Sequence, residues 1–146
     1  MYYDQYLEWS AYYLPIQIKG LRVLDVGAGE GETAKFFLEH GATSVTCIEP
    51  DNSSFCILKR NSVGKPLICM HKKFEVSDLN LPFDFMKMDI EGYEEDLLGE
   101  KFSQPCIIEV HGLPLKERFE KDGYTTILGP YGRANCLCYA YKNVKR

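Results

Sequence analysis

Short runs of apolar residues alternate along the chain with amphipathic stretches that repeat apolar side chains at helical spacing. The apolar runs predict seven strands, at 22–26, 44–48, 67–70, 83–88, 106–110, 125–128 and 136–142. The stretches between them predict helices at about 31–40, 52–61, 90–99 and 114–122. Strands that alternate with helices are typical of a parallel sheet with crossover helices, so we expect an α/β fold.

The connection between the last two predicted strands is too short to hold a crossover helix. Residues 129–135, GPYGRAN, are rich in turn formers, so we expect these two strands to be antiparallel. The sequence therefore predicts a Rossmann-like, mainly parallel sheet of about seven strands. We expect it to end in a C-terminal antiparallel hairpin and to carry helices on both faces.

Aromatic side chains are concentrated at the start of the chain, in MYYDQYLEWSAYYLP. Tyr2, Tyr6, Trp9 and Tyr13 recur there at helical spacing. A helix that packs on the sheet would explain this pattern. A lid over a ligand cleft would also explain it, because open α/β sheets bind ligands at the carboxyl ends of their strands. Both roles can hold at once.

The composition is that of a globular protein and disfavours several function classes. The chain has 146 residues, of which 45% are hydrophobic and 26% charged, with a net charge of −4. Because nucleic-acid binding usually needs a basic face, we do not expect nucleic acid as a partner. The sequence has no apolar run near the ~18 residues of a membrane span and no signal-peptide pattern. We therefore expect a cytoplasmic protein with no membrane contact.

Six cysteines raise the question of a disulfide framework or a metal centre. They form no C-x-x-C pair and no Cys/His cluster at zinc spacing. We expect buried free thiols and no metal site.

The segment VLDVGAGEGETA, residues 23–34, has the character of a glycine-rich turn between a strand and a helix. Its glycines are Gly27, Gly29 and Gly31, whereas a dinucleotide fingerprint, G-x-G-x-x-G, would need glycine in place of Glu32. Turns of this kind usually receive phosphate on the backbone N–H groups of a helix N-terminus. The spacing therefore argues against a dinucleotide.

Carboxylates around this turn indicate the ligand. A pyrophosphate would face Asp25, Glu30 and Glu32 with no basic residue nearby, and each charge would repel it. S-adenosylmethionine fits better because it combines adenosine with a sulfonium and an ammonium, and Asp25 can meet the ammonium. Glu49 ends the second predicted strand, where an acidic residue accepts ribose hydroxyls. The alternative for Glu49 is a solvated carboxylate at a strand end.

Lys87 is unexpected in the apolar strand that precedes Asp89 and Glu91. A buried lysine needs a partner, which these two carboxylates could supply. Alternatively, Lys87 lies at the strand margin and extends to water. Asp89 could likewise be a helix N-cap. Carboxylates beside a lysine suit the deprotonation or orientation of a hydroxyl acceptor.

His111 ends the fifth predicted strand and has a side chain suited to a general base near neutral pH. Glu109, two residues earlier on the same face, could orient it. The alternative is a hydrogen bond at the strand end. We expect His40, at a helix end, to be structural.

Several of these segments resemble a known enzyme family. VLDVGAGEGETA and SVTCIEPD resemble the first two cofactor motifs of class I S-adenosylmethionine-dependent methyltransferases. IEPDNSSFCILKRN, FDFMKMDIEGYEEDLLG and CIIEVHG are similar to motifs of the FkbM-type methyltransferases, in the same order, over about residues 22–112. The resemblance implies S-adenosylmethionine as the cofactor and O-methylation as the reaction.

From the residues and the resemblance together we expect two sets of site residues. The cofactor set is Asp25, Gly27, Ala28, Gly29, Gly31, Glu49, Pro50 and Asp89. The catalytic set is Asp89, Glu91, His111 and Lys87. If strand 125–128 runs parallel to the others, the turn that follows overhangs the cleft. Tyr131 and Arg133 would then contact the substrate, and the alternative is a solvated turn.

The sequence thus predicts one methyltransferase-like domain over 1–146. It would comprise an aromatic N-terminal helix at 1–20, a cofactor-binding core at 21–112 and a helix with a strand pair at 113–146. We expect methylation of a small-molecule or sugar hydroxyl by direct in-line transfer. The alternatives are an RNA methyltransferase that acts with a partner and a non-catalytic module that binds S-adenosylmethionine.

Overall fold

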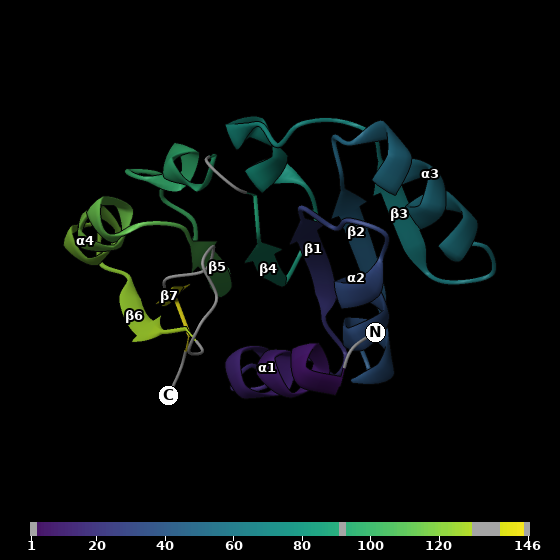
Figure 1. Cartoon of the computed structure of the whole chain (residues 1–146), viewed down its shortest axis with the longest axis horizontal. Helices are drawn as coiled ribbons and strands as arrows, with labels where there is room; N and C mark the ends of the chain where they lie inside the picture. Colours follow the sequence, from purple (N-terminus) through teal and green to yellow (C-terminus); the bar gives the residue numbers. More distant parts are fainter. Residues whose placement is uncertain (1–2, 91–92, 130–137, 145–146) are drawn as a thin grey trace.

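The fold is a seven-stranded sheet that runs through the centre of the molecule (Figure 1). It is described here from a computed structural model, which defines residues 3–90, 93–129 and 138–144. Across these residues the strand order is β3-β2-β1-β4-β5-β7-β6. The strands are β1 (Arg22–Val26), β2 (Ser44–Ile48), β3 (Leu67–Met70), β4 (Phe85–Met88), β5 (Cys106–Val110), β6 (Thr125–Leu128) and β7 (Cys138–Lys142).

Strands β1 to β5 are parallel neighbours, whereas β7 is antiparallel to both β5 and β6. The predicted Rossmann-like sheet with an antiparallel C-terminal pair is therefore confirmed. Strand β4 begins two residues later than the predicted range, at Phe85. Residues 136–137, the predicted start of the last strand, lie outside the described part of the chain.

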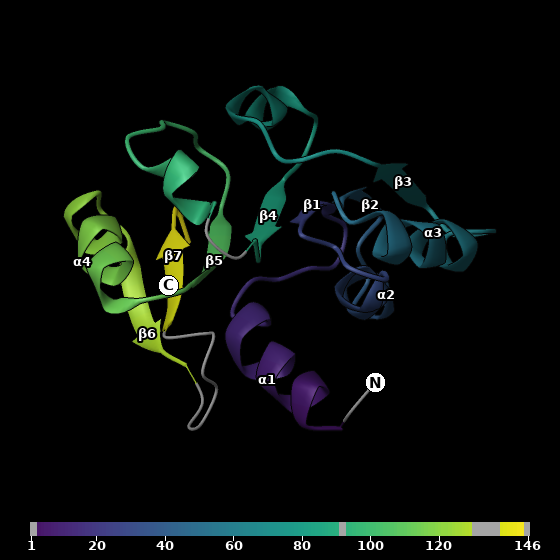
Figure 2. The ribbon, with the colours of Figure 1, turned by 45° about the horizontal axis from the view of Figure 1, so that its top comes forward.

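Helices cover both faces of the sheet (Figures 1 and 2). They are α1 (Tyr3–Tyr13), α2 (Glu32–Glu39), α3 (Asn52–Asn61), α4 (Leu113–Lys121) and the short 3₁₀ helices η1 (Val76–Asn80) and η2 (Glu94–Leu97). One apolar core lies between the sheet and the first three helices, and it contains Trp9, Phe36 and Leu58. A second core lies under α4 and the 3₁₀ helices, and it contains Phe119 and Leu97.

Local sequence explains where α3 begins and ends. The side chain of Asp51 accepts a hydrogen bond from the backbone N–H of Ser54 at 2.8 Å, which caps the first turn. This bond lowers the pKa of Asp51. Lys59 and Arg60 occupy the last turn, where cations interact favourably with the helix dipole.

The predicted helix at 90–99 is wrong. The described part of this segment forms only η2, a single 3₁₀ turn that carries three consecutive carboxylates, Glu94, Glu95 and Asp96. Its N-cap residue is Tyr93, so Asp89 does not cap it. The turn ends at its C-cap residue Leu98, which has an extended backbone, and Gly99 follows in a left-handed conformation with φ 81°. The amphipathic pattern was too short and too acidic to propagate an α-helix.

Helix α1 packs on the sheet through its aromatic face. Trp9 and Tyr13 are buried, and the Tyr13 ring meets the Phe37 ring edge-on, with centroids 5.6 Å apart. Tyr12 stacks on Tyr139 of β7 with centroids 3.9 Å apart. No helix in the described part of the chain has the length and apolar character that crossing a membrane requires.

Candidate active site

The ends of three parallel strands meet at the glycine-rich loop that follows β1. The backbone N–H groups of Gly27 and Ala28 both donate to the carbonyl of Ile48 in β2, at 2.9 and 3.1 Å. The N–H of Asp89, just after β4, donates to the carbonyl of Val26 at 2.9 Å. Gly27 has φ 77°, and a Cβ atom there would lie 2.0 Å from the Asp89 carbonyl oxygen. This close approach requires glycine.

Glu49 is fixed beside this loop by two backbone donors. Its Oε2 accepts a hydrogen bond from the N–H of Gly29 and its Oε1 accepts one from the N–H of Asp51, both at 2.8 Å. The side chain is buried. A carboxylate offers about four acceptor sites, so each oxygen keeps capacity for a further donor.

Asp25 is fully buried and forms an ion pair with Lys87. The two residues are register partners on adjacent strands, and Lys87 Nζ lies 2.9 Å from Asp25 Oδ1. Thr33 donates to the other oxygen of Asp25 at 2.6 Å, and Lys87 also donates to the carbonyl of Gly27 at 3.0 Å. The expected hydrogen-bonding partners of Lys87 were Asp89 and Glu91, whereas the structure pairs it with Asp25.

The carboxylates around Lys87 keep it charged. Burial alone would lower its pKa, but the negative charges of Asp25, Asp89 and Glu109 outweigh this and raise it. Lys87 is therefore a fixed cation at the end of β4 rather than a proton acceptor.

Asp89, Glu109 and His111 form a second polar group at the ends of β4 and β5. One carboxylate oxygen of each acid and one imidazole nitrogen all lie within 4.8 Å of one another. His111 Nε2 lies 3.6 Å from Asp89 Oδ1. Burial, followed by the nearby Asp89, raises the pKa of Glu109.

Glu94, from η2, orients His111. Its Oε1 lies 3.0 Å from His111 Nδ1 and also accepts a hydrogen bond from the His111 backbone N–H at 3.0 Å. Burial alone would raise the pKa of Glu94, but these hydrogen bonds outweigh it and the net pKa is lowered. The sequence suggested Glu109 for this orienting role. Glu94 lies within FDFMKMDIEGYEEDLLG, one of the segments similar to FkbM-type motifs, and that resemblance was the available signal for it.

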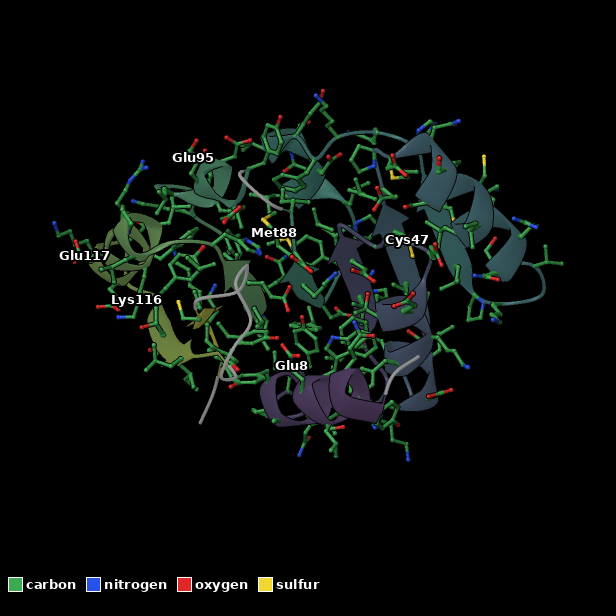
Figure 3. All side chains as sticks on the ribbon, viewed as in Figure 1. Glu8, Cys47, Met88, Glu95, Lys116 and Glu117 are labelled. Carbon is green, nitrogen blue, oxygen red and sulfur yellow. The ribbon has the colours of Figure 1, made fainter. Side chains whose placement is uncertain are left out.

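Tyr139 of β7 connects Glu109 to helix α1. Its hydroxyl lies 2.8 Å from Glu109 Oε1 and 2.5 Å from Glu8 Oε1. Burial raises the pKa of Tyr139, so the hydroxyl keeps its one proton and can donate to only one of these carboxylates at a time. Glu8 lies on the side of α1 that faces the strands (Figure 3). The sequence pattern had not singled out Tyr139 or Glu8.

A cavity of about 290 Å³ opens between the glycine-rich loop, the ends of β4 and β5, and α1. Its lining residues are Gln5, Trp9, Tyr13, Gly27, Ala28, Gly29, Glu30, Glu32, Thr33, Ser54, Lys87, Asp89 and Glu109. A larger cavity, of about 490 Å³, lies between the end of α1 and the β6–β7 pair, and none of the described residues that line it is an expected site residue. The smaller cavity is therefore the candidate site.

The structure groups some of the expected residues at this cavity and leaves others outside its lining. Gly27, Ala28, Gly29, Lys87 and Asp89 line it. Asp25, Gly31, Glu49, Pro50 and His111 do not, although each lies on or next to an element that does. Glu91, Tyr131 and Arg133 fall outside the described residues. Their proposed roles stay predictions.

The comparison with protein families agrees with this arrangement. Residues 73–129 match the family model described as the methyltransferase FkbM domain. The chain is therefore similar to the FkbM-type methyltransferases over these 57 of its 146 residues. The match supports the predicted methyltransferase activity with S-adenosylmethionine as the cofactor.

Solved structures share the fold of this chain. A ribosomal protein L11 methylase from Lactobacillus delbrueckii subsp. bulgaricus is similar over 92% of this chain and 77% of its own, with a TM-score of 0.64 and 19% identity. A fibrillarin from Aeropyrum pernix, solved with natively bound S-adenosyl-L-methionine, is similar over 90% and 72%, with a TM-score of 0.67 and 12% identity. A Pyrococcus horikoshii protein provisionally named an RNA methyltransferase is similar over 92% and 78%, with a TM-score of 0.59 and 24% identity.

A search of curated proteins found no match to the chain. The expectation that nucleic acid is not a partner gains no support from the comparisons, because the fold is shared with proteins named for RNA and for protein methylation. The acceptor must therefore be argued from the site itself.

Proposed function

We propose that this chain transfers the methyl group of S-adenosylmethionine to a hydroxyl of a small molecule or sugar. The observation that carries this proposal is the grouping of Asp89, Glu109 and Lys87 on the wall of the cavity that also holds the glycine-rich loop. Carboxylates can orient a hydroxyl and accept its proton. The hydroxyl oxygen then bonds to the methyl carbon, and the C–S electron pair returns to sulfur to give S-adenosylhomocysteine.

The loop side of the cavity would hold the cofactor. The small residues Gly27, Ala28 and Gly29 would permit close approach of the ligand, and Glu49 would accept hydrogen bonds from the ribose hydroxyls. Asp25 is enclosed by Thr33 and Lys87. Its role in this proposal is to hold Lys87 in place rather than to meet the cofactor directly. Pro50 and Gly31 would shape the backbone at the ends of β2 and the loop.

The catalytic side would be formed by Asp89, Lys87 and His111, with Glu91 proposed from the sequence motif alone. Lys87, as a fixed cation, would favour the negative charge that develops on the acceptor oxygen. Helix α1 closes the cavity from the other side through Gln5, Trp9 and Tyr13. This helix would exclude water from the reacting atoms, so it would combine the packing role and the lid role.

The acceptor class can be tested with donor labelled in its methyl group. Purified chain would be incubated with the labelled donor and a cell extract separated into small-molecule, RNA and protein fractions. We expect label in the small-molecule fraction, in a form that survives nuclease and protease, because the site offers carboxylates for a hydroxyl. Label that enters the RNA or protein fraction would contradict the proposal. Gly29→Val, which places a side chain in the loop that would bind the donor, is the matched control and should transfer no label.

Calorimetry tests the cofactor side. We expect S-adenosylmethionine and S-adenosylhomocysteine to bind and NAD not to bind, because Glu30 and Glu32 line the cavity and would repel a pyrophosphate. Glu49→Ala should weaken donor binding by about 1–3 kcal/mol, the cost of losing charge-assisted hydrogen bonds to two hydroxyls. Glu39→Ala, an exposed carboxylate at the end of α2, is the control and should bind as wild type does. Unchanged affinity in Glu49→Ala would show that Glu49 does not contact the donor.

A further inference from the structure

Three side chains converge at the ends of β4 and β5 in a pattern that suits a metal ion. Asp89 follows β4, whereas Glu109 and His111 come from the end of β5 and the residue after it. Their ligand atoms all lie within 4.8 Å of one another. Ligands on one cation lie at most about 4.4 Å apart when each bond is about 2.2 Å, so a side-chain shift of a few tenths of an ångström would close the site.

The imidazole of His111 is oriented as it would be in a metal site. A metal-binding histidine usually directs its second ring nitrogen to a carboxylate, which fixes the tautomer and the ring plane. His111 Nδ1 lies 3.0 Å from Glu94 Oε1. Nε2 then faces Asp89, at 3.6 Å. Glu94 is fully buried, and its Oε2 has no hydrogen-bond partner among the described residues.

Glu109 is also held from behind by a neighbouring side chain. It is only 6% exposed, and the Tyr139 hydroxyl lies 2.8 Å from its Oε1. Two of the three converging side chains therefore have orienting partners from different elements, η2 and β7. This preorganisation distinguishes the group from a chance cluster of surface acids.

The charges also suit a divalent cation. Two carboxylates and a neutral imidazole balance a double positive charge. Lys87 lies nearby, and its ammonium forms an ion pair with Asp25 at 2.9 Å. Asp89 and Glu109 line the cavity, and the Asp89 side chain is 38% exposed, which gives an ion a route in and open positions toward the acceptor.

We propose that Asp89, Glu109 and His111 bind one divalent cation of the Mn²⁺ or Mg²⁺ type at the acceptor end of the cavity. Carboxylate ligands favour these hard cations, and the single imidazole favours Mn²⁺ over Mg²⁺. Glu94 and Tyr139 are the positioning residues of this site.

The role of the ion rests on the proposed hydroxyl methylation. A cation bound to the acceptor oxygen lowers the pKa of the hydroxyl and holds the oxygen in line with the methyl group. With Asp89 and Glu109 engaged as ligands, the hydroxyl proton passes to solvent instead of to a carboxylate. An oxygen electron pair forms the C–O bond, and the C–S pair returns to sulfur. No oxidant or reductant takes part.

The site is tested by titrating the whole chain with Mn²⁺ in the absence of the methyl donor. Binding is measured as the loss of the free Mn²⁺ signal in electron paramagnetic resonance. We expect one Mn²⁺ per chain, displaced by excess Mg²⁺. Asp89→Asn, Glu109→Gln and His111→Gln should each weaken binding at least tenfold, and Glu94→Gln should weaken it by about 10–100-fold. Glu95→Gln removes a neighbouring exposed carboxylate of η2 and should bind as wild type does.

A thermal melt distinguishes loss of the ion site from failure of a variant to fold. Mn²⁺ should raise the melting temperature of the wild type and of Glu95→Gln but not that of Glu109→Gln, because only a native-state ligand stabilises by mass action. Absence of Mn²⁺ binding by wild type at millimolar ion would overturn the site. Equal affinity in wild type and the three ligand variants would do the same.

The same measurements separate this proposal from the proposed function. A chain that binds Mn²⁺ but not S-adenosylmethionine would keep the cation site and overturn the methyltransferase role. A chain that binds the donor but not Mn²⁺ would overturn the cation site alone.

Discussion

Replacement of Gly27 by alanine is expected to destabilise the fold by about 2–5 kcal/mol. The left-handed backbone, with φ 77°, costs a residue with a Cβ roughly 1–2 kcal/mol. The new Cβ would also lie 2.0 Å from the carbonyl oxygen and 2.8 Å from the carbonyl carbon of Asp89. These are backbone atoms, and the Asp89 N–H is bonded to Val26, so they have little freedom to move. Overpacking of this kind costs about 1–3 kcal/mol more.

Urea denaturation of Gly27→Ala and Gly20→Ala provides the measurement and its control. Gly20 has a similar φ of 84°, but a Cβ there would meet no atom within 4 Å. Gly20→Ala should therefore lose only the backbone contribution, roughly 1–2 kcal/mol. Equal losses in the two variants would mean that the β1 loop and the end of β4 can separate without cost. The close approach would then not be what holds the candidate site together.

Lys87→Met is expected to destabilise the fold by about 3–5 kcal/mol, because it leaves the fully buried carboxylate of Asp25 without its counter-charge. The side chains of Lys87 and Asp25 are only 2% and 0% exposed, so solvent cannot replace the lost partner. The double variant Asp25→Asn with Lys87→Met should recover part of this loss, because no unpaired charge then remains in the interior.

The same two strands carry a matched control for Lys87→Met at their opposite ends. Arg22 of β1 and Asp84, just before β4, form a pair 2.9 Å apart, with side chains 51% and 35% exposed. Arg22→Met should cost no more than about 1 kcal/mol, because exposed ion pairs contribute little. If Lys87→Met lost no more stability than this control, the buried pair would not be a structural determinant of the site.

The sequence was most informative where a pattern repeats over a whole element. Strands such as β1 and β5 have the predicted bounds because strands buried on both faces need continuous apolar runs. The prediction failed at 90–99, where apolar spacing was present but the described turn is acidic and short. Periodicity alone carries little weight over a segment of this length.

The partners of the site residues were harder to predict because they depend on strand order. Lys87 pairs with Asp25 because β1 and β4 are neighbours, although 62 residues separate the two side chains. Neighbours in the sequence, Asp89 and Glu91, were the natural candidates without that knowledge. His111 similarly meets Glu94 because η2 folds back beside the end of β5.

Helix α1 has a consequence for observing the protein at work. Trp9 is the only tryptophan in the chain, and its buried ring forms part of the cavity wall and lies edge-on to Phe36, with centroids 5.8 Å apart. Indole emission responds to the polarity and packing around the ring. A molecule that enters or leaves the cavity therefore changes the surroundings of the single indole ring. The unlabelled chain thus carries its own optical reporter of whether the cavity is occupied.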